Sequence, residues 1–230
     1  MNEVLRQERK FLLSMTQGMR LEEKLSAVLP PDPHNGPQGS YLVRSLYFDT
    51  TKNRDYREKE DGLELRRKIR LRIYTPQAAE AFLEMKQKQG GSQRKRSLKI
   101  GREQARRIAS GDYTPLLSYR EDFAAECYAL MKRDGYLPRS IVEYRRRAYI
   151  KPENNIRITL DSQVRALEGH CALFFEEKPG LYPVLDPWKV ILEVKYDHFL
   201  FSYIRDMIRS CNQSEVSVSK YCMARAGMLP

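Results

Sequence analysis

The sequence has 230 residues, of which 41% are hydrophobic and 31% are charged, and its formal net charge at pH 7 is +11. This composition can bury a substantial core, which excludes a disordered chain, and no apolar run approaches the roughly 20 residues of a membrane-spanning helix. A charge of this sign predicts an anionic partner, and nucleic acid, phosphate polymers, nucleotides and membrane surfaces all remain open.

One domain spanning residues 1–230 is expected, because neither an internal repeat nor a long flexible linker divides the chain. The first residues lack the long apolar stretch of a secretory signal, so we expect a cytoplasmic protein. The four cysteines match no zinc-ligand spacing and no dense disulfide framework, and they are expected to be reduced thiols: Cys127, Cys171, Cys211 and Cys222.

Apolar periodicity predicts an α+β fold with about eight strands, enough to close a barrel. In chain order we expect a strand at 6–13, a helix at 16–29, strands at 41–49, 64–74, 81–88 and 94–100, helices at 102–110 and 119–134, strands at 141–150, 155–164 and 190–196, a helix at 198–210, and a last helix near the C-terminus. The helix at 119–134 is expected to begin with a capping box made by Ser118 and Glu121.

Charged side chains share one face of most of these strands, because side-chain direction alternates along a strand. In the strand at 64–74, for example, Lys68, Arg70 and Arg72 oppose an apolar face. Across the strands this face carries the cations Lys10, Lys68, Arg70, Arg72, Lys86, Lys88, Arg146, Arg157 and Lys195, and the acids Glu8, Asp49, Glu84, Asp161 and Glu193. Ordinary half-exposed strands with solvated polar faces are one explanation of this pattern.

A closed, antiparallel, eight-stranded barrel with a polar, cationic lumen and helices packed outside is the explanation we favour. Such a lumen is too narrow for a duplex. It suits phosphate chains better than bases, because the aromatic side chains that would stack on bases alternate away from the charges. The sequence contains no Walker A motif, which excludes a P-loop nucleotide site.

The order of the short motifs resembles the VTC domain, the polyphosphate-polymerase module of the vacuolar transporter chaperone family, within the CYTH-like group of triphosphate tunnel enzymes. The matching segments are ERK near the start, SLYFDT, IRLRIY, a basic KRS segment, YRRRAY, RITLD, LEVK and a final SKY. The resemblance implies a barrel whose tunnel binds triphosphate and a divalent metal, Mn²⁺ or Mg²⁺. It also implies transfer of the terminal phosphate of ATP to a growing polyphosphate chain.

Site residues follow from the resemblance, position by position. Catalytic roles are implied for Arg70, Arg72, Lys86, Arg146 and Lys220. Substrate-binding roles are implied for Lys10, Lys88, Lys95, Arg96, Tyr144, Arg157 and Lys195. Glu193 is the implied metal ligand, and Glu8 or Glu84 would supply further carboxylate oxygens. The chain departs from the eukaryotic catalytic pattern at two positions. It has Ser217 where that pattern has a lysine, and it has Lys88 where that pattern has a histidine, shortly after the lysine that matches Lys86.

ATP and inorganic polyphosphate are the expected partners, without a specific nucleic acid. A membrane-protein partner, which would bring the chain to a membrane, and the oligomeric state are left open. Two other functions fit the same residues, namely a metal-dependent inorganic or nucleoside triphosphatase and a non-catalytic polyphosphate- or RNA-binding module. Nine cations against five acids on the charged face favour polymer handling.

Overall fold

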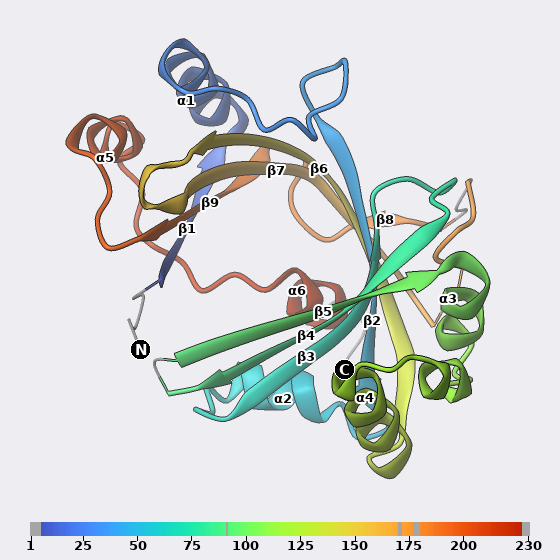
Figure 1. Ribbon diagram of the computed structural model, residues 1–230. Coiled ribbons are helices and arrows are strands. Elements are labelled where there is room, and N and C mark those ends of the chain that lie inside the picture. The colour runs from blue at the N-terminus through green and yellow to red at the C-terminus, as the bar shows by residue number, and fades with distance from the viewer. Residues whose placement is uncertain (1–5, 91, 170–171, 177–179, 227–230) are drawn as a thin grey trace. The chain divides into compact units, whose positions relative to one another are not determined.

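The computed structural model describes residues 6–90, 92–169, 172–176 and 180–226, which form an α+β fold (Figure 1). The strands are β1 (Arg6–Ser14), β2 (Tyr41–Thr50), β3 (Arg66–Ile73), β4 (Glu80–Gln89), β5 (Ser92–Gly101), β6 (Tyr136–Lys151), β7 (Ile156–Glu168), β8 (Tyr182–Pro183) and β9 (Lys189–Asp197). The helices are α1 (Met15–Val28), α2 (Arg54–Glu60), α3 (Arg102–Ala109), α4 (Asp122–Arg133), α5 (Ser202–Arg209) and α6 (Lys220–Ala226), with 3₁₀ turns η1 (Thr114–Ser118) and η2 (Glu153–Asn155). The predicted α+β class and all eight predicted strands are confirmed.

The chain divides into two compact units. The first comprises Met1–Leu42, Tyr144–Val164 and Leu185–Val218, and the second comprises Val43–Glu143, Arg165–Val184 and Ser219–Pro230. Each unit has its own hydrophobic core. The organisation as one domain over residues 1–230 stays a prediction, as does closure of the strands into a barrel with a cationic lumen.

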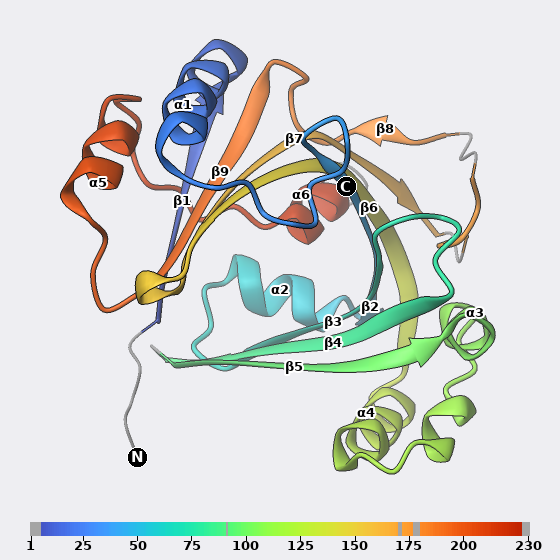
Figure 2. The same ribbon diagram turned by 45° about the horizontal axis from the view of Figure 1, so that its top comes forward.

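In the first unit the strand order is β1-β9-β7-β6, and β9 is antiparallel to both β1 and β7. Helices α1 and α5 lie side by side (Figure 2). Their apolar side chains, such as Leu25 of α1 and Ile204 of α5, join Leu192 and Val194 of β9 in the core. The opposite face of these strands is left for the charged side chains.

Helix α1 begins with a capping box that the sequence patterns did not single out. Ser14 Oγ accepts a hydrogen bond from the backbone N–H of Gln17, and Gln17 Oε1 accepts one from the backbone N–H of Ser14. Gln17 Nε2 also donates to the carbonyl of Cys211, at 2.8 Å, just beyond α5. The start of α1 and the end of α5 are therefore fixed to each other, which keeps both helices on the apolar face.

In the second unit the strand order is β6-β2-β3-β4-β5, and the consecutive pairs from β2 to β5 are antiparallel. Helices α3 and α4 contact β5 and bury their apolar sides there. The register places Leu71 opposite Leu83, which lies opposite Leu98, so one face of β3, β4 and β5 is apolar. Alternation then places the charged side chains of β3 and β4 on the other face.

Two local predictions need correction. The capping box at the start of α4 is wrong, because Ser118 Oγ donates to the Pro115 carbonyl and Glu121 makes no capping hydrogen bond. Helix α2 was not predicted, because its sequence RDYREKE has no apolar stripe. Two N–H groups of its first turn are instead satisfied by the carboxylate of Asp49, which accepts from Asp55 N at 2.9 Å and from Tyr56 N at 3.0 Å.

The expected reduced thiols are confirmed for Cys127, Cys211 and Cys222, which are buried and free. Cys171 lies outside the described residues. None of the helices within the described ranges has the length and hydropathy needed to cross a membrane.

Candidate functional site

Two lysines and two glutamates alternate on the charged face of β1 and β9 in the first unit. The register places Glu8 opposite Lys195 and Lys10 opposite Glu193. Lys10 Nζ lies 3.1 Å from Glu8 Oε1 and 3.5 Å from Glu193 Oε2. Lys195 Nζ forms an ion pair with Glu193 and lies 4.0 Å from Glu8 Oε2. The four predicted site residues are therefore one cluster in which the charges of these side chains cancel.

The two lysines of this cluster differ in proton affinity. Burial acts to lower the pKa of Lys10, but Glu193 and Glu8 outweigh it, so the pKa lies above its ordinary value. In Lys195 burial prevails over the same two carboxylates, so its pKa is lowered. Lys10 is thus a permanent cation, and Lys195 is the member of the cluster that loses its proton more readily.

Arg146 of β6 is held by Asp161 of β7 in a two-point ion pair. Its Nε and Nη2 donate to the two oxygens of Asp161, each at 2.7 Å, and the two residues are 6% and 0% exposed. The guanidinium also lies over the ring of Tyr144, 5.3 Å from its centroid. Burial opposes the charge, but Asp161 prevails and the pKa of Arg146 is raised well above its ordinary value. Arg146 is therefore a cation of fixed orientation.

Arg157 of β7 pairs with residues outside the cluster of Lys10, Lys195 and the two glutamates. Its Nη2 donates to Asp32 Oδ2 at 2.7 Å and to the hydroxyl of Tyr41 at 2.9 Å. Burial acts to raise the pKa of Asp32, but the backbone N–H of His34 and the Arg157 guanidinium hold it at about 2. The Arg157–Asp32 pair is thus charged on both sides over the whole neutral range.

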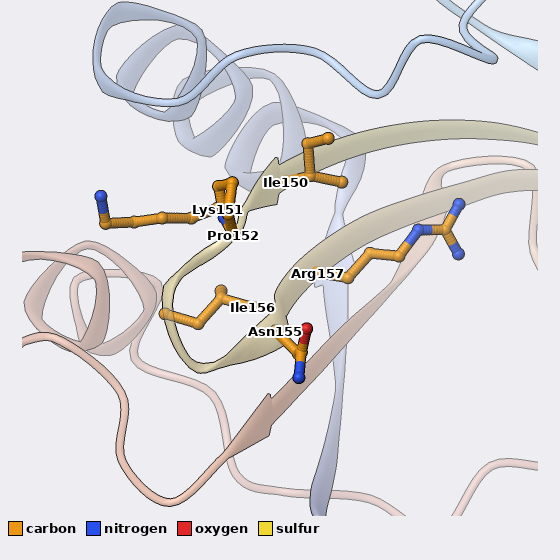
Figure 3. Close-up of a pocket in the computed structure, with 6 residues that line it drawn as sticks. All are labelled: Ile150, Lys151, Pro152, Asn155, Ile156 and Arg157. Carbon is orange, nitrogen blue, oxygen red and sulfur yellow. The ribbon is translucent and has the colours of Figure 1, made fainter.

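A pocket of about 450 Å³ lies at the turn between β6 and β7 (Figure 3). It is lined by Ile150, Lys151, Pro152, Asn155, Ile156 and Arg157. Figure 3 shows the side chains of Lys151 and Arg157 extending in opposite directions, so the two cations do not converge on one ligand. Since Arg157 is the only predicted site residue among those lining it, this pocket is not the candidate site.

The second unit carries a row of cations across three neighbouring strands. The register aligns Lys68 of β3, Lys86 of β4 and Lys95 of β5, and in the next row of this face it places Arg70 opposite Glu84. Residues directly opposite each other in a sheet point to the same face. Lys88 belongs to this face as well, one row nearer the β4–β5 turn and opposite Arg66.

Glu84 lies at the centre of this face. Arg70 donates to Oε2 through Nε at 2.7 Å, and Lys95 Nζ lies 2.6 Å from Oε1. The Arg72 guanidinium lies farther away, 3.7 Å from Oε2. Burial acts to raise the pKa of Glu84, but Arg70, Arg72 and Lys95 hold it at about 2. Three cations and one carboxylate leave these four side chains with a net charge of +2.

Two adjacent basic residues of β5 are separated by strand alternation. Lys95 reaches Glu84, whereas Arg96 lies on the other face of the strand. There Arg96 Nη2 donates to Glu126 of α4 at 2.6 Å, and its guanidinium lies 4.9 Å from the ring centroid of Phe123. Of these two implied substrate-binding residues, Lys95 lies beside Glu84, whereas Arg96 is held by α4 on the other face.

A tyrosine pair connects Arg70 with the segment that carries Lys220. Arg70 Nη1 donates to the hydroxyl of Tyr47 at 2.9 Å, and the ring of Tyr47 stacks on Tyr221, with centroids 5.0 Å apart. The Tyr221 hydroxyl donates to Asp49 Oδ2 at 2.6 Å. Since Lys220 directly precedes Tyr221, its position at the start of α6 is set by this contact.

Sequence analysis missed the role of both tyrosines. A signal was available for Tyr47, because it shares the charged face of its strand with Asp49. Nothing in the local sequence linked Tyr47 or Asp49 to Tyr221, which follows Asp49 by 172 positions.

A divalent metal is implied by the predicted family, and Glu8 and Glu193 are the residues to test. Within the described ranges, no group of three or more His, Cys, Asp and Glu side chains has the geometry of a metal site. The buried carboxylate of Glu193 and the half-buried carboxylate of Glu8 nevertheless fit Mg²⁺ or Mn²⁺, because such ions are commonly held by one or two carboxylates together with substrate phosphates. The donor set therefore suits a metal that is bound jointly with a phosphate ligand.

Comparisons with known proteins bear on the family and the fold. The sequence profile of the VTC domain matches residues 5–229. No curated protein sequence matches the chain. A solved structure from Hippeastrum, of a protein provisionally described as an adenylyl cyclase and reported to have a dominant triphosphatase activity, superposes with a TM-score of 0.56 and 15% identity, covering 97% of this chain and 96% of that chain.

A second solved structure, from Bacillus halodurans, is of a protein provisionally described as an adenylate cyclase. It superposes with a TM-score of 0.55 and 12% identity, covering 94% of this chain and 95% of that chain. At these identities the similarities establish a common fold.

Proposed function

Because the chain belongs to the VTC domain family, we propose that it is a metal-dependent polyphosphate polymerase, which transfers the terminal phosphate of ATP to a growing polyphosphate chain. The family and the fold support a function on polyphosphate or triphosphate. The observation that carries the finer proposal is the surplus of positive charge around Glu84, where Arg70, Arg72 and Lys95 share one carboxylate.

Phosphoryl transfer requires little covalent chemistry from the protein, so catalysis depends on aligning the reactants and stabilising charge on the phosphate oxygens. In this proposal Arg70 and Arg72 bind those oxygens with their planar guanidinium groups, which stay protonated beside other cations. Lys86 and Lys220 add positive charge to the same ligand. A general base is not required, because the end of a polyphosphate chain is already an anionic nucleophile.

The first unit carries its own set of candidate phosphate and metal ligands, which includes Lys10, Arg146 and Glu193. Asp161 fixes the guanidinium of Arg146, and the carboxylates of Glu8 and Glu193 would hold a metal ion together with a phosphate ligand. The bound ion would neutralise charge on the phosphates. Lys10 and Lys195, which pair with the same two carboxylates, would supply positive charge to the phosphate oxygens.

Hydrolysis of inorganic or nucleoside triphosphate is the second candidate, with water in place of the polyphosphate end as acceptor. The triphosphatase activity of the Hippeastrum protein, which has the same fold, favours it. The two reactions use the same donor contacts and differ only in the acceptor.

The experiment is to incubate the purified chain with ATP and Mn²⁺, and separately with tripolyphosphate and Mn²⁺, and to follow polymer on gels and free phosphate in solution. Polymer with ADP and little free phosphate is the expected result. Free phosphate without polymer would establish the triphosphatase, and neither product, with polyphosphate bound independently of metal, would mean a binding module.

Matched variants make the test specific to the site. Arg70→Ala and Arg72→Ala are expected to abolish turnover with unchanged circular dichroism, whereas Arg107→Ala, which removes half of an exposed pair with Asp112, retains it. Turnover that survives both site changes would refute the assignment. ATP and polyphosphate are the proposed partners, and location in the cytoplasm stays a prediction.

A further inference from the structure

Ser45 of β2 and Arg72 of β3 form one directly opposed pair of the β2–β3 ladder, so both side chains point to the charged face of the second unit. They are 1% and 7% exposed. Neither Ser45 Oγ nor Arg72 Nε has a hydrogen-bond partner among the described residues. Two adjacent polar groups are thus buried without a partner at one step of the ladder.

The next pair of the β2–β3 ladder on the same face has satisfied polar groups, so in these two pairs the missing hydrogen bonds are confined to Ser45 and Arg72. Two residues along, Tyr47 opposes Arg70, and there the phenol accepts a hydrogen bond from the guanidinium at 2.9 Å. Buried polar groups are almost always satisfied, because leaving one without a partner costs more than the bond itself contributes. The unsatisfied step therefore points to a ligand that supplies the missing acceptor.

The positive charge of Arg72 indicates which kind of ligand would supply the acceptor. Arg72 approaches Glu84 only to 3.7 Å, and that carboxylate already accepts from Arg70 and pairs with Lys95. The charge of Arg72 is therefore incompletely neutralised by Glu84. The Ser45 hydroxyl and the Arg72 Nε–H are both able to donate, and a non-bridging phosphate oxygen is an acceptor that carries negative charge.

We propose that Ser45 is a substrate-binding residue, whose hydroxyl donates a hydrogen bond to a phosphate oxygen held by Arg72. The inference rests on the proposed function, since it assigns a further contact to the same phosphate-binding face. The ligand is the phosphate chain of either ATP or inorganic polyphosphate, which present the same oxygens.

Calorimetric titration of the full chain with tripolyphosphate, and separately with ATP, tests the proposal. Ser45→Ala is expected to raise the Kd of at least one ligand about tenfold to a hundredfold, the size of a hydrogen bond to a charged group. A change for tripolyphosphate alone or for ATP alone identifies whose phosphates occupy this position. Ser118→Ala, which removes a hydroxyl bonded to the Pro115 carbonyl in the same unit, is the matched control and leaves both Kd values unchanged.

Thermal unfolding distinguishes a ligand contact from a structural one. Alanine removes an unsatisfied hydroxyl without breaking a hydrogen bond, so the melting temperature of Ser45→Ala is expected to equal or exceed that of the parent chain. A melting temperature that falls together with the affinity would overturn the proposal in favour of a packing role.

Two further outcomes separate this inference from the proposed function. Unchanged Kd values for Ser45→Ala, while Arg70→Ala loses binding, would overturn the role of Ser45 and leave the phosphate site standing. A parent chain that binds neither tripolyphosphate nor ATP would overturn both.

Discussion

Removing the charge of Asp161 tests how Arg146 is held. Asp161→Asn preserves the shape of the side chain, but the amide offers one acceptor oxygen where the carboxylate accepted two hydrogen bonds at 2.7 Å. The guanidinium of Arg146, which is 6% exposed, is then left as a buried charge without its anionic partner. Breaking a buried ion pair on one side costs about 3–5 kcal/mol of folding free energy.

Differential scanning calorimetry measures this loss. For a chain of this size 1 kcal/mol corresponds to about 2–4 °C in melting temperature, so a decrease of roughly 6–20 °C is expected. Asp112→Asn, which breaks the exposed pair with Arg107, serves as the control and is expected to leave the melting temperature unchanged.

A double variant tests whether the unpaired charge of Arg146 causes the loss of stability in Asp161→Asn. Arg146→Gln combined with Asp161→Asn removes the stranded charge, so the double variant is expected to melt at a higher temperature than Asp161→Asn alone. A decrease of less than about 2 °C for Asp161→Asn would refute the reasoning, because it falls below the cost of an unpaired buried charge. A double variant no more stable than the single one would show that the loss comes from packing instead.

Two further predictions concern the interior of the second unit. Burial and the neighbouring Asp49 raise the pKa of Asp55 from 3.8 to about 8, so between these values the folded chain binds a proton that the unfolded chain does not. The free energy of unfolding is therefore expected to fall as pH rises through this window. Melting temperatures at about pH 6 and about pH 9 should differ less for Asp55→Asn than for the parent chain. An equal difference for both chains would contradict the prediction. Tyr221→Phe retains the stacking on Tyr47 but removes the 2.6 Å hydrogen bond to Asp49. The change is expected to lower the free energy of unfolding, measured by urea denaturation, by about 1.5–3 kcal/mol. An unchanged denaturation midpoint would disprove the contact.

Alternation along the strands was sufficient to place most of the charged face. Lys68 and Arg70 share a face because they are two residues apart, and the antiparallel pairing of β3 with β4 makes Lys86 and Glu84 their direct neighbours. These placements depend only on the period of a strand and on hairpin register, both of which are local properties of the sequence.

The partners of these cations were not predictable from the same pattern. Asp161 was identified as an acid of the charged face, but its two-point ion pair with Arg146 depends on how β6 and β7 pair across 15 residues. Lys95 and Arg96 are equally basic neighbours, and only their directions distinguish them. Helix α2 depends on a capping carboxylate from Asp49, a contact outside any helix-start pattern.

The carboxylates that hold the candidate cations have a consequence for binding strength. Glu84 and Glu193 already occupy positions beside the ammonium and guanidinium groups that a phosphate chain would approach. Binding would then be an exchange, in which an anionic ligand takes the place of an anion that belongs to the protein. Salt weakens the binding of polyanions through the dissolved counterions that are released, and a tethered carboxylate is not released. The affinity for polyphosphate should therefore depend less steeply on ionic strength than the number of cations alone would indicate.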